Sequence, residues 1–229
     1  MSKPLANAKS GDGKVVAIFG STGTAGGGAV RACLLDPCVS EVRAITRRPI
    51  AIADSKLRHV MCSDFGNLAA IESDLSGLDT CLFCLGTSVR NVKGEAEYRE
   101  IHVSYALAAA RTLLAQSPRA SLVYLSGGGA SSTSRMMWAR VKAEAEEKLA
   151  QVGLARLICV RPGGILPLEP TGANRWLLAP LLRLLPSVMG IGAEELGRAM
   201  LRAGLDSNFG RSGSILENRS LKEIAKHSG

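Results

Sequence analysis

The chain has 229 residues, of which 46% are hydrophobic and 21% charged, and this predicts one globular domain with a substantial core. No apolar run approaches the roughly 18 residues of a membrane-spanning helix, and residues 1–13 lack the apolar centre of a secretory signal. We therefore expect no membrane span, a cytoplasmic location and a flexible tail over residues 1–13.

The net charge of +8 raises the question of a nucleic-acid partner. However, the basic residues are scattered, Arg47 and Arg48 forming the adjacent pair, and aromatic residues make up only 4% of the chain. Because nucleic-acid sites need basic patches and often aromatic platforms, we expect no nucleic-acid binding.

The six cysteines lie mostly in apolar segments, which favours reduced core thiols over a disulfide framework. Cys81 and Cys84 have C-x-x-C spacing, but residues three apart in a strand point to opposite faces and no second pair completes a zinc site. No metal site is expected.

Strand and helix patterns alternate along the chain. Strands are predicted at 14–19, 41–46, 57–62, 80–85, 121–125 and 154–160, and helices at 24–35, 67–75, 95–116 and 137–151. This alternation is typical of a doubly wound, mostly parallel α/β sheet, the Rossmann arrangement, which binds ligands at the carboxyl ends of its strands.

The first strand ends in the most informative motif of the chain. Gly20, Gly23 and Gly26 follow an apolar run and open a helix. A sharp turn, close approach of backbone N–H groups to a pyrophosphate and tight helix packing each exclude a side chain. We therefore expect this loop to bind a dinucleotide rather than form a plain turn, through Gly20, Ser21, Thr22, Gly23, Thr24, Ala25 and Gly26.

Arg47 and Arg48 follow the second strand, where a Rossmann domain meets the adenosine ribose. An acidic residue there accepts hydrogen bonds from the 2′-hydroxyl of NAD, whereas Arg suits a 2′-phosphate. No acidic residue stands at this point, so the pair predicts NADP(H), with a solvated turn as the alternative.

After residue 161 the pattern loosens. A helix at 194–205, a strand at 214–217 and a helix at 221–226 are predicted. Residues 14–229 thus form one Rossmann domain, in which 161–229 contribute a small C-terminal lobe for substrate or partner. The apolar stretch 175–186 is expected to be a buried helix, with a flap over the site or a homodimer contact as alternatives.

Seven short segments together carry a family resemblance: FGSTGTAG at 19–26, ITRR at 45–48, SDF at 63–65, CLGT at 84–87, VKAE at 141–144, RPG at 161–163 and ILEN at 215–218. With them the chain resembles the atypical short-chain dehydrogenase/reductases of the Tat-interacting-protein kind. The resemblance implies a single NADP(H)-binding domain and redox-linked regulatory roles. It also implies cofactor contacts from Asp64, Phe65, Leu85, Gly86, Thr87, Lys142, Arg161, Pro162 and Gly163.

In that superfamily a Tyr four residues before a Lys is the general acid/base, and an upstream Ser orients the carbonyl. The matching positions here are Trp138, Lys142 and Ser126. An indole N–H donates a hydrogen bond but does not shuttle a proton at physiological pH. Tyr98 is the tyrosine expected to face the cleft, with His102 one helical turn further on.

Two interpretations therefore stay open. The chain is either an NADPH-dependent reductase of small carbonyl compounds that uses a substitute proton source, or a non-catalytic NADP(H)-sensing protein that regulates a protein partner.

Overall fold

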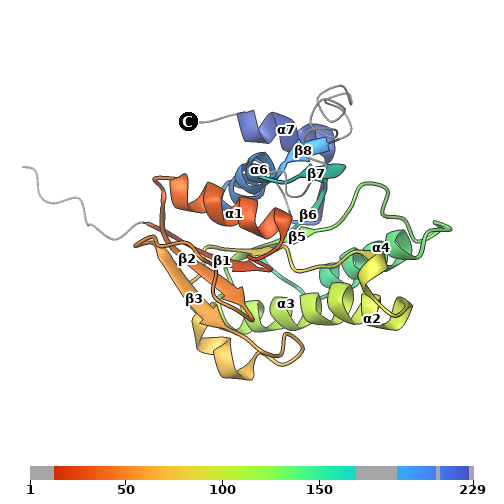
Figure 1. Ribbon diagram of the computed structural model, residues 1–229, viewed down its shortest axis with the longest axis horizontal. Helices are drawn as coiled ribbons and strands as arrows, with labels where there is room; N and C mark the ends of the chain where they lie inside the picture. Colours follow the sequence, from red (N-terminus) through yellow and green to blue (C-terminus); the bar gives the residue numbers. More distant parts are fainter. Residues whose placement is uncertain (1–12, 169–189, 210–211, 227–229) are drawn as a thin grey trace, which may run out of the picture.

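The structure is a computed structural model that describes residues 13–168, 190–209 and 212–226 (Figure 1). Seven parallel strands form one sheet in the order β3-β2-β1-β4-β5-β6-β9. Their bounds are β1 Lys14–Phe19, β2 Val39–Thr46, β3 Leu57–Met61, β4 Thr80–Phe83, β5 Ser121–Leu125, β6 Arg156–Arg161 and β9 Ser214–Glu217. A short parallel pair, β7 (Gly164–Leu166) and β8 (Gly190–Gly192), lies beyond the carboxyl end of β6. The predicted doubly wound α/β fold is confirmed.

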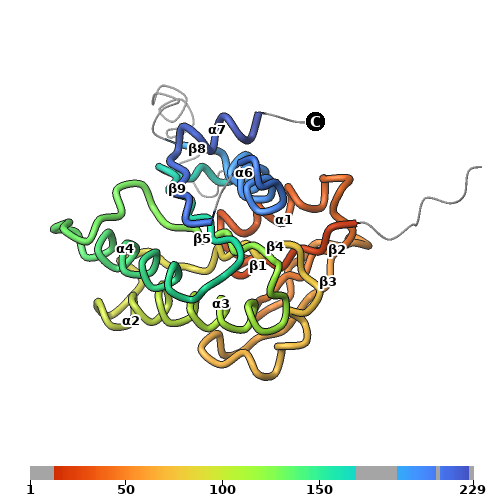
Figure 2. The backbone as a smooth tube through the Cα atoms, turned by 180° about the vertical axis from the view of Figure 1, so that it is seen from behind, coloured from red at the N-terminus to blue at the C-terminus, as the bar shows by residue number. Residues whose placement is uncertain are grey.

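Helices cover both faces of the sheet. One layer holds α1 (Thr24–Leu35), α6 (Ala193–Leu205) and α7 (Asn218–Lys226), drawn above the sheet in Figure 1. The other holds α2 (Glu95–Arg99), the π-helical segment η3 (Glu100–Ser104), α3 (Tyr105–Gln116) and α4 (Met137–Ala150). The view from behind shows the same two layers (Figure 2). Two short 3₁₀ segments, η1 (Ala69–Leu75) and η2 (Val89–Asn91), complete the described helices.

Each layer encloses its own apolar core. Phe19, Phe83 and Tyr124 are fully buried on the side of α3 and α4, whereas Ile18, Leu82 and Ile158 face α1 and α6. All four residues of β4 are buried, as expected of a central parallel strand covered on both faces. Cys81 and Cys84 belong to opposite cores, and all six cysteines are free.

Several boundaries differ from the predicted ones. Strand β4 ends at Phe83, so residues 85–87 leave the sheet as a loop, and β2 begins two residues earlier than predicted. The predicted helix 67–75 is a 3₁₀ segment, and the predicted helix 95–116 contains the π segment η3. The stretch 175–186 and most of the tail 1–13 lie outside the described residues. None of the described helices is both long and apolar enough to cross a membrane.

Candidate dinucleotide site

The glycine loop between β1 and α1 owes its shape to two of its three glycines. Gly20 has a φ of 80°, and a Cβ there would lie 2.7 Å from the backbone nitrogen of Leu85. A Cβ on Gly26 would lie 2.1 Å from the carbonyl oxygen of Gly20. Gly20 therefore makes the turn, and Gly26 lets α1 pack against it.

Gly23 is less confined, because a Cβ there would lie 3.4 Å from the nearest heavy atom, the Gly20 oxygen. It is exposed and caps the amino end of α1 without a side-chain acceptor, and the first turn of α1 contains no acidic residue. Ser21 turns inward and donates to the Ile18 carbonyl over 3.0 Å. The amino end of α1 thus presents backbone amides and a positive dipole end to a phosphate.

Thr22 and Thr24 are exposed beside this helix end, while Ala25 is buried beneath it. The hydroxyl groups of Thr22 and Thr24 could donate further hydrogen bonds to phosphate oxygens. Thr22, Gly23 and Thr24 are therefore exposed together at the amino end of α1, while Ser21, Ala25 and Gly26 are buried.

The next part of the site lies at the end of β2. Arg47 and Arg48 are exposed, and the turn that carries them is fixed by Thr46, whose hydroxyl donates to the Arg48 carbonyl over 2.7 Å. A cavity of about 60 Å³ lies here, lined by Gly20, Thr22, Ile45, Thr46, Arg47, Arg48, Phe65 and Leu85. None of these lining residues is acidic, so the cavity combines two guanidinium groups with no competing carboxylate.

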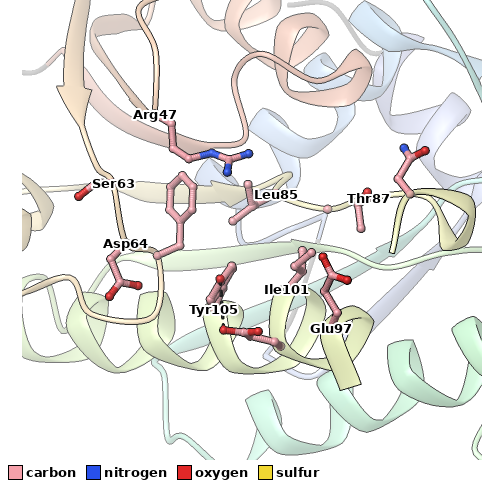
Figure 3. Close-up of a pocket in the computed structure, with 12 residues that line it drawn as sticks. Arg47, Ser63, Asp64, Leu85, Thr87, Glu97, Ile101 and Tyr105 are labelled. Atoms are coloured by element: carbon pink, nitrogen blue, oxygen red, sulfur yellow. Dashed lines mark hydrogen bonds between the residues drawn. The ribbon is translucent and has the colours of Figure 1, made fainter. Parts of the chain in front are cut away.

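A larger cleft of about 420 Å³ continues from Arg47 (Figure 3). Arg47, Ser63 and Asp64 line one end, Leu85 and Thr87 lie along its middle, and Glu97, Ile101 and Tyr105 reach it from the α2–η3–α3 helix. Phe65 and Gly86 also line the cleft. Phe65 packs between Phe19 and Tyr105, with ring centroids 6.2 Å and 6.0 Å away. Phe65, Leu85, Ile101 and Tyr105 form an apolar part of the lining that suits a flat nucleobase, while Asp64, Glu97 and Glu100 bring carboxylates into the same cleft.

Tyrosine placement differs from the expectation. Tyr105 lines this cleft, whereas Tyr98 is only 4% exposed and packs against the His102 ring at 4.1 Å. The sequence did not indicate this, because the π segment between the two tyrosines rotates the helix beyond it. Glu97, Glu100 and Tyr105 therefore line the cleft although motif reading did not include them, whereas His102 is buried and does not line it.

Lys142 projects from α4 and is 7% exposed. Its Nζ donates to the Leu125 carbonyl over 2.7 Å and lies 5.0 Å from the centre of the Tyr124 ring. Burial lowers the pKa of Lys142 to about 7. Ser126, directly after β5, is buried, and its hydroxyl has no hydrogen-bond partner among the described residues. Both groups are polar, buried and close to the carboxyl end of β5.

Trp138 lies one helical turn before Lys142 and is half-buried. Its six-membered ring covers the loop after β5, approaching to 3.4 Å of a Cβ position at Gly127 and 3.8 Å of one at Gly129. The indole therefore fills space that the glycines leave open. It places no titratable proton donor beside Lys142.

Arg161 is placed differently from the other predicted contacts. Its guanidinium donates to Glu146 over 2.9 Å and 2.5 Å and to Glu217 over 3.3 Å, in a separate groove of about 440 Å³ beside α4. Pro162 accepts from the Gly128 amide over 2.8 Å, and the Gly163 amide donates to Asn218 over 3.0 Å. Residues 161–163 thus connect the loop after β5 to the C-terminal lobe.

No family model matches the chain. Over 222 residues it is 27% identical to protein HTATIP2 of Rattus norvegicus, an alignment that covers 94% of this chain and 90% of that protein. It is 29% identical over 153 residues to protein fmp52, mitochondrial, of Aspergillus fumigatus, with 65% of each chain covered.

Solved structures show the same fold. An oxidoreductase of the short-chain dehydrogenase/reductase family from Burkholderia thailandensis has a TM-score of 0.70 at 16% identity, covering 90% of both chains. The enzyme WbmF of Bordetella bronchiseptica, solved in complex with NAD+, has a TM-score of 0.67 at 16% identity, covering 93% of this chain and 76% of that one.

Proposed function

We propose that this chain, an atypical short-chain dehydrogenase/reductase of the Tat-interacting-protein kind by its sequence and fold, binds NADP(H) in the site described above. The observation that carries the proposal is the uncapped, glycine-lined amino end of α1 beside an arginine-lined cavity that has no carboxylate. The amino end of α1 would bind the pyrophosphate of NADP(H), and the arginine-lined cavity would bind the 2′-phosphate on its adenosine ribose. WbmF, a structural neighbour, binds NAD+.

In this proposal, different residues of the chain bind different parts of the cofactor. Residues 20–26 hold the pyrophosphate, and Arg47 and Arg48 hold the 2′-phosphate through charge-assisted hydrogen bonds. Asp64, Phe65 and residues 85–87 line the cleft assigned to the adenine. Lys142 and Ser126, both buried near the carboxyl end of β5, are assigned to the nicotinamide ribose and to a carbonyl group by the resemblance alone. The contacts that the resemblance implies for residues 161–163 are not assigned in this proposal, since the Arg161 guanidinium is engaged by Glu146 and the Gly163 amide by Asn218.

Bound NADPH would supply a hydride. The chain's own contribution to a reduction would be the unpartnered Ser126 hydroxyl, which can orient a carbonyl oxygen, and Lys142, whose pKa near 7 leaves it able to release a proton at neutral pH. Trp138 supplies none. We therefore propose an oxidoreductase-like NADP(H)-binding protein whose substrate would be a small carbonyl compound.

A second function is favoured by Trp138 itself. A tryptophan at the position of the proton donor, together with the glycine loop and the arginine pair, would suit a protein that senses NADP(H) and regulates a protein partner. Turnover separates the two: consumption of NADPH with aldehydes, ketones or quinones supports the reductase, and tight binding without turnover supports the sensor. The cytoplasmic location and the homodimer stay predictions.

Calorimetric titration with NADPH and NADH tests the binding proposal. NADPH is expected to bind about 5- to 150-fold more tightly, the equivalent of roughly 1–3 kcal/mol for charge-assisted phosphate contacts. The double variant Arg47→Ala, Arg48→Ala should lose this preference, whereas Arg111→Ala, an exposed arginine on α3, should keep it. Equal affinities in the unmodified protein would refute the NADP(H) preference.

A further inference from the structure

A buried histidine connects the helix to the loop that lines the cleft. His102 belongs to the π segment η3 and is 2% exposed. Its Nε2 lies 3.3 Å from the Thr87 amide nitrogen and 3.2 Å from the Thr87 carbonyl oxygen. Its Nδ1 has no partner among the described residues, so the polar contacts of the ring are concentrated on Thr87.

Three further contacts hold His102 in place, two at its ring and one at its backbone. Tyr98 of α2 packs against it at 4.1 Å between centroids, and Tyr124 of β5 donates from its hydroxyl to the His102 carbonyl over 3.1 Å. A Cβ on Gly86 would lie 2.7 Å from His102 Cε1. Gly86 therefore has to be a glycine because of the imidazole, independently of any cofactor.

The π segment explains how the ring reaches the loop. An i→i+5 turn widens the helix locally and changes which side chains point to the sheet, and such segments are frequent at functional sites. Here it turns His102 inward, while Ile101 and Tyr105, one residue before it and three after, line the cleft. The π segment thus places Ile101 and Tyr105 in the lining of the cleft and His102 behind the loop that lines it.

We infer that His102 is a positioning residue: its imidazole, bonded to Thr87 and packed on Gly86, holds residues 85–87 in the shape that forms the middle wall of the cofactor cleft. Of the measurements that test this inference, only the NADPH affinity depends on the proposed function, because the others need no cofactor. His102 acts through the loop and touches no reacting atom.

The experiment compares two substitutions of similar size. His102→Leu fills the buried space without a polar group, and His102→Gln keeps a polar atom at the position of Nε2. We expect His102→Leu to weaken NADPH binding roughly 3- to 10-fold, the effect of one lost hydrogen bond, with a melting temperature no lower than that of the unmodified protein. His102→Gln should restore most of the affinity.

Amide hydrogen exchange without any cofactor gives the second readout. The Thr87 amide should exchange faster in His102→Leu and at nearly the original rate in His102→Gln. If the unmodified protein binds no NADPH, the proposed function fails, and this exchange measurement still decides the role of His102. Unchanged exchange at Thr87 in His102→Leu would overturn the inference, as would unchanged NADPH affinity in a protein that binds it.

A double-mutant cycle tests the packing contact should His102→Leu not fold. Gly86→Ala is expected to speed exchange at Thr87 in the unmodified background and to have little effect in the background of His102→Ala, where the ring is absent. Equal effects of Gly86→Ala in the two backgrounds would show that the imidazole does not constrain the loop.

Discussion

The chemistry of the site depends most on the pair formed by Trp138 and Lys142. Lys142 is buried, and burial lowers its pKa to about 7. Its ammonium group donates a hydrogen bond to the Leu125 carbonyl, which holds it near the end of β5. The short-chain dehydrogenase/reductases that the chain resembles have a phenol one helical turn earlier, where this chain has an indole packed on Gly127 and Gly129. Under the proposed function, the lysine would therefore lack the acid that normally accompanies it.

We predict that Trp138→Tyr introduces or raises carbonyl reductase activity. The new phenol would stand one turn before Lys142, whose ammonium lowers a phenol pKa, and a positioned acid typically contributes on the order of 10² to 10⁴ in rate. NADPH oxidation over a panel of aldehydes, ketones and quinones measures the gain, with Trp138→Phe as the control that lacks the hydroxyl. The prediction is wrong if the unmodified protein reduces a carbonyl efficiently and Trp138→Tyr impairs it.

His102 gives the protein a stability that depends on pH. Burial, and secondly the charge of Lys142 on α4, lower the pKa of His102 to about 3. The unfolded chain takes up this proton near pH 6.5, before the folded one, so the contribution is complete above that pH and is lost as the pH falls toward 3. Tyr98, the Tyr124 hydroxyl and the Thr87 backbone face the ring as neutral groups.

Urea unfolding at pH 7.5 and 5.5 should therefore show a loss of about 1 kcal/mol in the free energy of unfolding from this residue. Lowering the pH to 5.5 stays above the range in which carboxylates such as Glu41 and Glu144 take up protons. His102→Leu is expected to reduce the loss by about this amount and to leave the smaller part that Lys142 contributes, because the pKa of Lys142, about 7, also lies in this pH range. His59→Gln, at an exposed histidine on β3, should keep the whole loss. An equal loss in His102→Leu would contradict the assignment.

Among the helices, the contact between α1 and α6 is the closest in the α1 layer. A Cβ on Gly28 would lie 2.2 Å from the Ala193 carbonyl oxygen, and one on Gly197 would lie 2.6 Å from the Gly28 carbonyl oxygen. These neighbours are backbone atoms, which cannot move unless the helices separate. Because the amino end of α1 also forms part of the candidate site, the contact with α6 helps to fix the position of that site.

We predict that Gly28→Ala destabilises the fold by roughly 1–3 kcal/mol, the usual penalty for overpacking a tight contact. Gly27→Ala is the matched control, since it lies in the same helix and its Cβ would meet only the Ser21 oxygen, at 3.7 Å. That variant should be neutral or slightly more stable, because alanine favours a helix by up to about 1 kcal/mol over glycine. Denaturant unfolding measures both, and equal effects would show that α1 and α6 are not closely packed.

At the scale of the whole molecule, the sequence predicted what depends on repeated local patterns. Apolar runs such as 80–83, each followed by a helical pattern, led to the correct sheet because a buried parallel strand must be apolar on both faces. The turn at Gly20 was likewise readable, since its positive φ demands glycine.

Features that depend on contacts between distant segments were not readable. The π segment has no sequence signal, and without it Tyr98 was expected to face the cleft that Tyr105 lines instead. Gly86 was expected to be a cofactor contact, but the His102 ring explains it equally well. Arg161 belongs to a motif, yet its pairing with Glu146 and Glu217 joins elements up to 56 residues apart.

The site draws on the ends of β1, β2, β3, β4 and β5 in one continuous sheet, so cofactor binding should stabilise the molecule as a unit. A ligand at 100 times its Kd adds about 2.7 kcal/mol to the free energy of unfolding. For a domain of this size that amounts to a rise of about 5–10 °C in Tm, measurable by differential scanning fluorimetry.

At one fixed concentration NADPH should produce this rise, and NADH much less, because only NADPH presents a 2′-phosphate to Arg47 and Arg48. The compound 2′,5′-ADP should retain part of it, since it carries both phosphate groups that face α1 and the arginine pair. A larger shift with NADH than with NADPH would mean that the arginine cavity does not select the cofactor.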